Sequence, residues 1–410
     1  MIFLATVVPA GLFYFRIVDT YAPGTGLVVL FALFASWISG RSLRGSGDML
    51  SLLACLMLLC HLVVASTFQA VEWVRALSSL LFFFLLLFGS AHIAPLIYRI
   101  PEDRFRRDMR HLGYFMLGVA LLGLIEFAPP TLTGAPWPRP YFPFTEPAGF
   151  ALPLAPVLMY LCVMAKGPQR TWLLIGTVLG MALITTLTLA VAVALIAAVS
   201  LKRSHLIAFA LILCAVLAQL DLSYYTERID FFSDNNSNLS NLVYVQGWQL
   251  LFEGLERSSF LGQGFQQLGI HGTDVAAAQI INAMMQGEDL NLLDGSFLLA
   301  KLGAELGIFG LTIAAAATAY ALRSILILRR VATGQLHVPA VIVFAHSTMA
   351  SLLLRLYVRS GGYFNGEMFL TLIAAWILAS HHLASRKPRP RQASRRPQKN
   401  MAVERARLNG

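Results

Sequence analysis

Arginines and carboxylates near the predicted ends of apolar segments are the side chains that could do chemistry in this chain. Arg355 and Arg359, in the stretch SLLLRLYVRSGGYFNGE, are four residues apart, so a helix would place both on one face near its end. A guanidinium binds phosphate oxygens through two parallel N–H donors, and an adjacent pair suits a diphosphate. The alternative is that both side chains extend to membrane headgroups without binding a ligand.

A second group lies in the stretch PWPRPYFPFTEPAGFALPLAP, residues 136–156, where prolines and aromatic residues precede an apolar run. The prolines exclude helix there, so the backbone must be buried in protein or line a wet cavity. Glu146 could accept a proton or orient an arginine, and Arg139 could contact phosphate or sugar. A salt bridge or a helix N-terminal charge is the simpler explanation. Trp137 and Tyr141 could stack on sugar faces, although aromatic residues also gather at membrane interfaces.

Three further residues are candidates by position. Asp294 precedes the apolar segment 296–322, where N-capping would explain it equally well. Trp248 is a candidate for sugar contact and Arg228 for diphosphate contact. Seven arginines are expected at or near the outward side of the membrane: Arg16, Arg75, Arg139, Arg228, Arg257, Arg355 and Arg359.

Metal and cofactor sites are not expected. The loops expected on the outward side of the membrane contain no Asp-x-Asp pair and no His/Cys cluster of the kind that holds Mg²⁺ or Zn²⁺. The four cysteines all lie inside apolar segments and have no metal-ligand spacing: Cys55, Cys60, Cys162 and Cys214.

Composition defines the elements that must position these residues. The chain of 410 residues is 57% hydrophobic and 13% charged, with a mean hydropathy of +0.68, which is far outside the range of soluble domains. Apolar runs long enough to cross a bilayer recur along it, whereas a transmembrane β-barrel would show short alternating segments. The sequence therefore predicts an all-α integral membrane protein.

The apolar runs and the basic loops together predict about twelve transmembrane helices with both chain ends in the cytoplasm. Segment 171–201 is too long for one crossing and too short for two full ones. Basic loops fall on one side only if it makes two short passes that bend near Thr185, Thr186 and Thr188. One long, steeply tilted helix is the alternative. The predicted spans are 2–16, 24–40, 50–67, 74–97, 111–128, 148–165, 171–201 (two), 206–220, 296–322, 339–357 and 366–383.

This topology divides the chain into four parts. Residues 1–220 form an N-terminal transmembrane bundle that includes an outward Pro-rich loop at 129–147. Residues 221–295 form a large outward loop, and 296–385 form the C-terminal transmembrane helices. The tail 386–410 is basic and Pro-rich, so we expect it to be disordered beside anionic inner-leaflet lipid. Nucleic acid is not an expected partner, because the tail has no interleaved aromatic residues.

The large loop contains two patterns. VYVQGWQLLFEGL, residues 243–255, has helical apolar spacing and predicts an amphipathic helix along the membrane surface. FLGQGFQQLG follows, with glycines at 262, 264 and 269, and predicts a tight turn close to a ligand or a neighbouring helix. No strand precedes these glycines and their spacing is wrong for a dinucleotide site.

Three stretches of the chain resemble the bacterial O-antigen polymerase and ligase family. These are FTEPAGFALPLAP (144–156), GWQLLFEGLERSSFLGQGFQQLG (247–269) and NLLDGSFLLAKLGAELGIFGL (291–311). The resemblance implies a GT-C-like glycosyltransferase of the bacterial inner membrane with its active site facing the periplasm. Such enzymes transfer a glycan from undecaprenyl diphosphate to an acceptor sugar hydroxyl, and a chain-length regulator is a possible partner.

The family divides into polymerases, which extend another lipid-linked repeat unit, and ligases, which transfer the glycan to lipid A core. Ligases resemble HNxxL after the large loop, whereas this chain has LDGSFL with Asp294 at that place. The difference favours a polymerase of O-antigen lipopolysaccharide or of another surface polysaccharide, with Glu146 and Asp294 as the catalytic candidates. A lipid A core ligase is the alternative.

A lipid-linked oligosaccharide flippase or transporter is the alternative of a different class. Transporters usually consist of two similar halves. Here the second half contains a large outward loop that the first lacks. This asymmetry favours an enzyme. A scaffold without activity would not need arginines at membrane depth.

Overall fold

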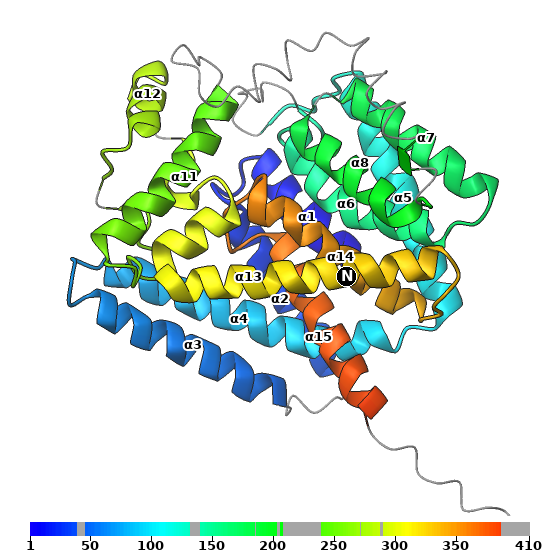
Figure 1. Cartoon of the computed structure of the whole chain (residues 1–410), viewed down its shortest axis with the longest axis horizontal. Helices are drawn as coiled ribbons and strands as arrows, with labels where there is room; N and C mark the ends of the chain where they lie inside the picture. Colours follow the sequence, from blue (N-terminus) through cyan, green and yellow to red (C-terminus); the bar gives the residue numbers. More distant parts are fainter. Residues whose placement is uncertain are drawn as a thin grey trace, which may run out of the picture.

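The computed structural model describes residues 1–38, 46–131, 140–184, 186–202, 206–207, 239–270, 272–287 and 290–386, and its regular elements there are helices (Figure 1). Seven of these helices are long and apolar enough to cross a membrane, which agrees with the predicted all-α, multi-pass membrane protein. They are α2 (Tyr21–Ile38), α3 (Ser46–Ala65), α4 (Trp73–Tyr98), α6 (Pro147–Met164), α13 (Leu298–Ala332), α14 (Ala340–Tyr357) and α15 (Gly366–Arg386).

Four other helices coincide with predicted spans but do not meet those criteria of length and composition. Helices α1 (Ile2–Tyr14) and α8 (Leu187–Ser200) are apolar and shorter, while α7 is Pro168–Leu183. Helix α5 (Glu102–Leu124) begins before the predicted residue 111, because charged residues form its first turns. The predicted span 206–220 lies outside the described residues except for 206–207. The number of twelve spans therefore stays a prediction.

The break predicted within 171–201 is confirmed. Helix α7 ends at Leu183 and α8 begins at Leu187, and the side chain of Thr186 caps α8 by accepting a hydrogen bond from the Leu189 amide at 3.1 Å. A β-branched residue with a side-chain oxygen favours such a cap over continuation of the helix. The segment is thus two helices and not one long one.

The exposed surface of several helices is apolar, as a lipid-facing surface requires. On α3, Met49, Leu52, Leu56 and Met57 are all more than half exposed. Helices α3 and α4 pack against each other at one edge of the molecule (Figure 1). In contrast, α14 is buried along nearly all of its length and packs against α6 and α13. The centre of the molecule is therefore formed by α6, α13 and α14.

The helix ends separate into two groups. At the end that carries the basic loops, the Arg170 guanidinium donates hydrogen bonds to the carbonyls of Ala165 at 2.7 Å and Ala332 at 2.8 Å, which joins the ends of α6 and α13. Cations at carbonyl ends of helices are favoured by the helix dipole. The loops 358–365 and 140–146 lie at the opposite helix ends, because α14 ends and α6 begins there.

Helix α13 is kinked at Gly307, which has φ of 59° and ψ of −137°. The glycine-rich turn after α11 enters this kink. The amides of Gln263 and Gly264 donate to the carbonyls of Ala304 and Glu305 at 2.9 and 2.8 Å, and the Ile308 amide donates to Phe260 at 2.9 Å. These contacts satisfy backbone groups that the kink removes from the helix. The predicted tight turn therefore approaches a neighbouring helix.

Gly262 at this junction offers a test of the packing. Its φ is +91°, and an added Cβ would overlap the backbone of Gly307 and Leu306. We expect Gly262→Ala to destabilise the protein by on the order of 3 kcal/mol through strain and overlap. Gly272, with φ +71° and open space around it, is the matched control, and its alanine variant costs only about 1 kcal/mol. The melting temperatures of the two purified variants in detergent are the measurement. Equal values would contradict the tight packing of Gly262 against the kink of α13.

The predicted outward loop 221–295 contains two α-helices among its described residues, α11 (Leu239–Arg257) and α12 (Ala276–Met284). They lie together at one end of the molecule (Figure 1). The helix expected over 243–255 is confirmed, and it packs on α13, where an added Cβ on Gly254 would lie 2.8 Å from the Ala304 Cα. Whether this helix lies along a membrane surface stays a prediction.

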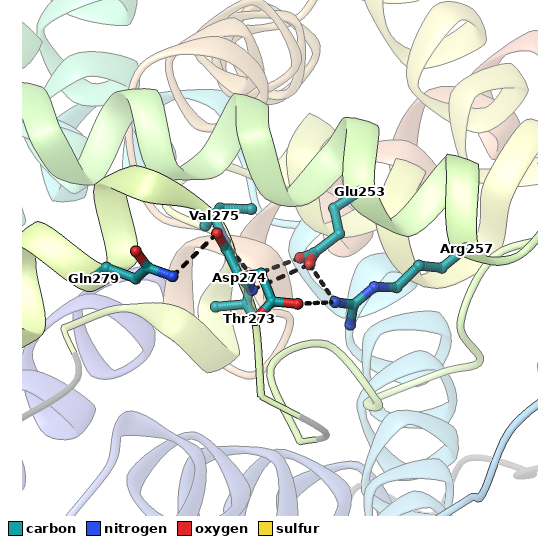
Figure 2. A network of polar contacts seen from close by, with 6 residues as sticks. All are labelled: Glu253, Arg257, Thr273, Asp274, Val275 and Gln279. Atoms are coloured by element: carbon teal, nitrogen blue, oxygen red, sulfur yellow. Dashed lines mark hydrogen bonds and ion pairs between the residues drawn. The ribbon is translucent and has the colours of Figure 1, made fainter.

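Polar contacts fasten α12 to α11 (Figure 2). The Arg257 guanidinium contacts Glu253 at 2.8 Å and Asp274 at 3.1 Å. The Thr273 hydroxyl donates to Glu253 at 2.6 Å, and the Gln279 amide donates to the Asp274 carbonyl at 3.4 Å. Glu253 and Arg257 are therefore structural residues of this loop.

Candidate functional site

A cavity with a volume of about 690 Å³ lies where the ends of several helices meet. Its walls come from α1, from the first turns of α2, α4, α6 and α15, from α11, and from loop 358–365. Ligand sites are commonly concave and between 300 and 1,000 Å³. We call it the larger cavity. It lies at the end opposite to the basic loops.

Glu146 and Arg359 form an ion pair on the wall of this cavity. The Arg359 Nη2 contacts Glu146 Oε1 at 2.6 Å and Oε2 at 2.7 Å. Glu146 is the N-cap of α6 with extended backbone, and Pro147 at the first helical position fixes that helix start. Arg359 follows the end of α14 at Tyr357. The side chains are 43% and 36% exposed, so a ligand can reach both.

A second cavity of about 510 Å³ lies on the other side of this pair, and Glu146 and Arg359 line both cavities. Its described lining is rich in hydroxyl and amide side chains, including Thr188, Ser240 and Asn241. Arg359 is the one cation among those lining residues, whereas two carboxylates, Glu126 and Glu146, are present. We call it the second cavity. Its chemistry suits a neutral polyhydroxyl ligand.

Asp294 lines the larger cavity from the short 3-10 helix η1 (Leu292–Asp294). It is not a helix N-cap, because α13 begins at Leu298 and its N-cap is Phe297. The Lys301 Nζ contacts the Asp294 carboxylate at 3.4 Å and donates to the Leu293 carbonyl at 2.6 Å. The Asp294 side chain is 58% exposed, so it keeps access to a ligand.

Lys301 itself is buried, and it contacts the buried carboxylate of Glu305. Its side chain is 1% exposed, and the Glu305 carboxylate, with 0% exposure, lies 3.7 Å from Nζ. The Tyr363 ring lies 5.2 Å from the same Nζ. Burial, followed by the negative charges of Glu305 and Asp294, raises the pKa of the Tyr363 phenol well above 10, so Tyr363 stays neutral. Through its contacts with Asp294 and with the Tyr363 ring, Lys301 joins Asp294 to loop 358–365.

Arg355 does not share an exposed helix face with Arg359. Its side chain is 3% exposed, and its Nη2 donates to the Gly362 carbonyl at 2.7 Å beneath the larger cavity. The expectation of one shared face fails because α14 ends at Tyr357, so Arg359 belongs to the following loop. The Arg355 Nε and Nη1 are buried and have no hydrogen-bond partner among the described residues. Arg355 therefore supports the loop that carries Arg359.

Arg75 is a cavity-lining cation that the sequence reasoning named as outward but did not select. It lies in the first turn of α4 and lines the larger cavity. Among the described residues, the structure gives its guanidinium no ion pair or hydrogen bond, whereas Arg359 is bound to Glu146 and Lys301 to Asp294. Of the two arginines on this wall, Arg75 is thus the one without a carboxylate contact.

The predicted aromatic sugar contacts have different outcomes. Tyr141 lines the second cavity, but its ring is 6% exposed and stacks on Phe150 at 5.7 Å. Burial raises the pKa of its phenol. Trp248 packs against Phe297 at 5.1 Å and is not among the described residues that line either cavity. Trp137, Arg139 and Arg228 lie outside the described residues.

The comparisons with known proteins do not identify a family for this chain, so its class must be inferred from the fold and the site. No family model, no curated protein and no solved structure matches this chain. Within the described part of the chain, no three His, Cys, Asp or Glu side chains lie close enough together to hold a metal ion. The fold and site define a multi-helix membrane protein with a charged double cavity at one group of helix ends.

Proposed function

We propose that this chain is a surface polysaccharide polymerase of the bacterial inner membrane. It transfers a glycan from undecaprenyl diphosphate to the terminal sugar of another lipid-linked repeat unit, without a metal ion. The observation that carries the proposal is the Glu146–Arg359 ion pair in the wall between two cavities. A transferase with two large substrates needs a base and a cation at the place where those substrates meet.

The larger cavity supports binding of the lipid-linked donor. Arg75 and Arg359 provide guanidinium groups for the diphosphate. Two of the carboxylates on the same wall have a cation beside or behind them: Asp294 has Lys301 at 3.4 Å, and the charge of Glu367 attracts that of Arg355. Apolar residues of α1, such as Pro9 and Phe13, complete the wall where a lipid chain would pass.

The chemistry follows from the groups at the boundary. The acceptor hydroxyl oxygen forms a bond to the anomeric carbon as its proton passes to Glu146. The bond between that carbon and the diphosphate oxygen breaks, and its electron pair leaves with the lipid diphosphate. Arg359 and Arg75 stabilise the charge that develops on this leaving group. Because a lipid diphosphate is already a good leaving group, no metal ion is needed in principle.

The proposed orientation places the site in the periplasm. Basic loops face the cytoplasm in membrane proteins, and here they lie at the helix ends opposite to the larger cavity. The resemblance of 144–156, 247–269 and 291–311 to polymerases and ligases supports the same orientation. Two of these stretches meet in the kink of α13, which gives them a shared structural role.

Arg75→Gln tests the donor side of the site. We expect polymer synthesis to fall by about 10²-fold, because the variant loses a cation that stabilises the leaving diphosphate. Arg16→Gln is the control, since Arg16 is exposed at the same helix ends and does not line either cavity. The amount of polymer at equal membrane abundance is the measurement. Equal activity of the two variants would remove Arg75 from the site.

The surface polysaccharide of a deletion strain tests the proposed function. A polymerase predicts loss of long chains with a single repeat unit still attached to core. Core without any repeat unit indicates the lipid A core ligase or a flippase instead. Unchanged long chains would exclude a role in this polysaccharide.

A further inference from the structure

We infer that the Glu146–Arg359 ion pair is a gate that makes the base available only after the donor diphosphate has bound. The inference rests on the proposed function and assigns the larger cavity to the diphosphate donor and the second cavity to the acceptor sugar. In the free protein the carboxylate is engaged by Arg359 Nη2 through both of its oxygens. A diphosphate that draws Arg359 into the larger cavity releases those oxygens toward the second cavity.

The geometry gives the pair the position of a gate. Glu146 and Arg359 line both cavities, together with Ser240, Tyr244 and Val358. Arg359 is attached to a loop beyond the end of α14, while Glu146 is fixed at the start of α6 by Pro147. The arginine is therefore the partner that can move, and the carboxylate is the partner that stays.

The strength of the contact fits a reversible gate. A partly exposed ion pair contributes little net free energy, because solvent screens it and both side chains lose freedom. A diphosphate carries more negative charge than one carboxylate and offers more oxygens to the guanidinium. It therefore competes effectively for Arg359, and Arg75 on the same wall adds to its attraction.

The number of arginines in each cavity favours binding of the donor first. Four carboxylates also line the larger cavity: Asp19, Glu146, Asp294 and Glu367. Both arginines that line the larger cavity face the donor, whereas the described lining of the second cavity adds no cation to Arg359. An acceptor sugar that arrives first meets a base whose oxygens are occupied. Glu146 therefore becomes free to take the proton of the acceptor hydroxyl only when the donor diphosphate has drawn Arg359 away.

A double-mutant cycle on diphosphate binding tests the gate. Purified protein in nanodiscs is titrated with geranylgeranyl diphosphate and, separately, with inorganic diphosphate. Glu146→Gln removes the competing charge, so we expect it to bind geranylgeranyl diphosphate about tenfold more tightly than the wild type. Arg359→Gln should bind it more weakly. In the Arg359→Gln background, the additional Glu146→Gln change should raise the affinity no more than removal of any other negative charge from this cavity does, because no cation remains to be released.

Asp19→Asn is the matched control for removal of a negative charge. Asp19 is exposed and lines the larger cavity, and the structure shows no ion pair for it among the described residues. The gate predicts a smaller gain in affinity for Asp19→Asn than for Glu146→Gln. Two results would overturn the gate: equal gains in affinity for Asp19→Asn and Glu146→Gln, or the same gain for Glu146→Gln with and without Arg359. Either would mean that Glu146 acts only through its general negative charge.

Three further outcomes would also overturn it. These are the absence of detectable diphosphate binding to wild type and Glu146→Gln alike, weaker binding by Glu146→Gln, and tighter binding confined to inorganic diphosphate. Tighter binding confined to inorganic diphosphate would mean that the site does not bind a lipid-linked donor. A failed gate with lost polymer in the deletion strain leaves the proposed function standing, while a confirmed gate with unchanged polymer refutes the function alone. Melting of each variant controls for folding.

Discussion

Replacing Glu146 with glutamine is expected to reduce polymer synthesis by about 10²- to 10⁴-fold, which is the usual contribution of a general base. The amide keeps the size of the side chain and one acceptor for Arg359, but it does not take a proton from the acceptor hydroxyl. The protein should reach the membrane at wild-type abundance, because this ion pair is partly exposed and contributes little stability. Chain length and amount of polymer are the measurement.

Glu256→Gln is the matched control for this variant. Glu256 is an exposed carboxylate on α11 that does not line either cavity. Its replacement should leave polymer synthesis near the wild-type rate. Wild-type polymer from the Glu146→Gln strain would transfer the role of base to another carboxylate, and Asp294 is the next candidate on the same cavity.

Lys301→Met is expected to have the largest effect on stability. It leaves the Glu305 carboxylate, which has 0% exposure, without the cation that lies 3.7 Å away. Removal of one partner of a buried pair typically costs about 3 to 5 kcal/mol. It also frees the Leu293 carbonyl and Asp294, so we expect the variant to melt at a lower temperature and to accumulate poorly in the membrane.

The second change Glu305→Gln should restore much of that loss. The double variant Lys301→Met/Glu305→Gln contains no unpaired buried charge, so it should melt closer to the wild type than Lys301→Met alone does. Melting of all four proteins in detergent completes the cycle. If the two single losses simply add in the double variant, the residues are not a coupled pair.

Several helices and the position of Glu146 at a helix start could be predicted from the sequence. Apolar runs predict α2, α3, α4, α6, α14 and α15 closely, and the threonine cluster predicts the break before α8. Prolines before 147 predict that Glu146 stands at a helix start in extended backbone. Each of these features depends on local physical chemistry, so a short stretch of sequence contains it.

The partners of these residues could not be predicted in the same way. Glu146 and Arg359 are 213 positions apart, and no local pattern joins them. Arg355 and Arg359 have helical spacing, but α14 ends between them, and this depends on the packing of loop 358–365. Lys301 was overlooked although a signal existed, since a lysine four residues before Glu305 in an apolar helix indicates a buried pair.

Reconstitution of the purified protein tests glycan transfer between lipid-linked repeat units most directly. Vesicles that contain only this protein and an undecaprenyl diphosphate-linked repeat unit should produce a ladder of longer lipid-linked chains and free undecaprenyl diphosphate, and the ladder should persist in excess EDTA. The Glu146→Gln protein should leave the repeat unit unextended. A wild-type sample that leaves the repeat unit at its original length, with and without EDTA, would contradict the proposal that this chain is a polymerase.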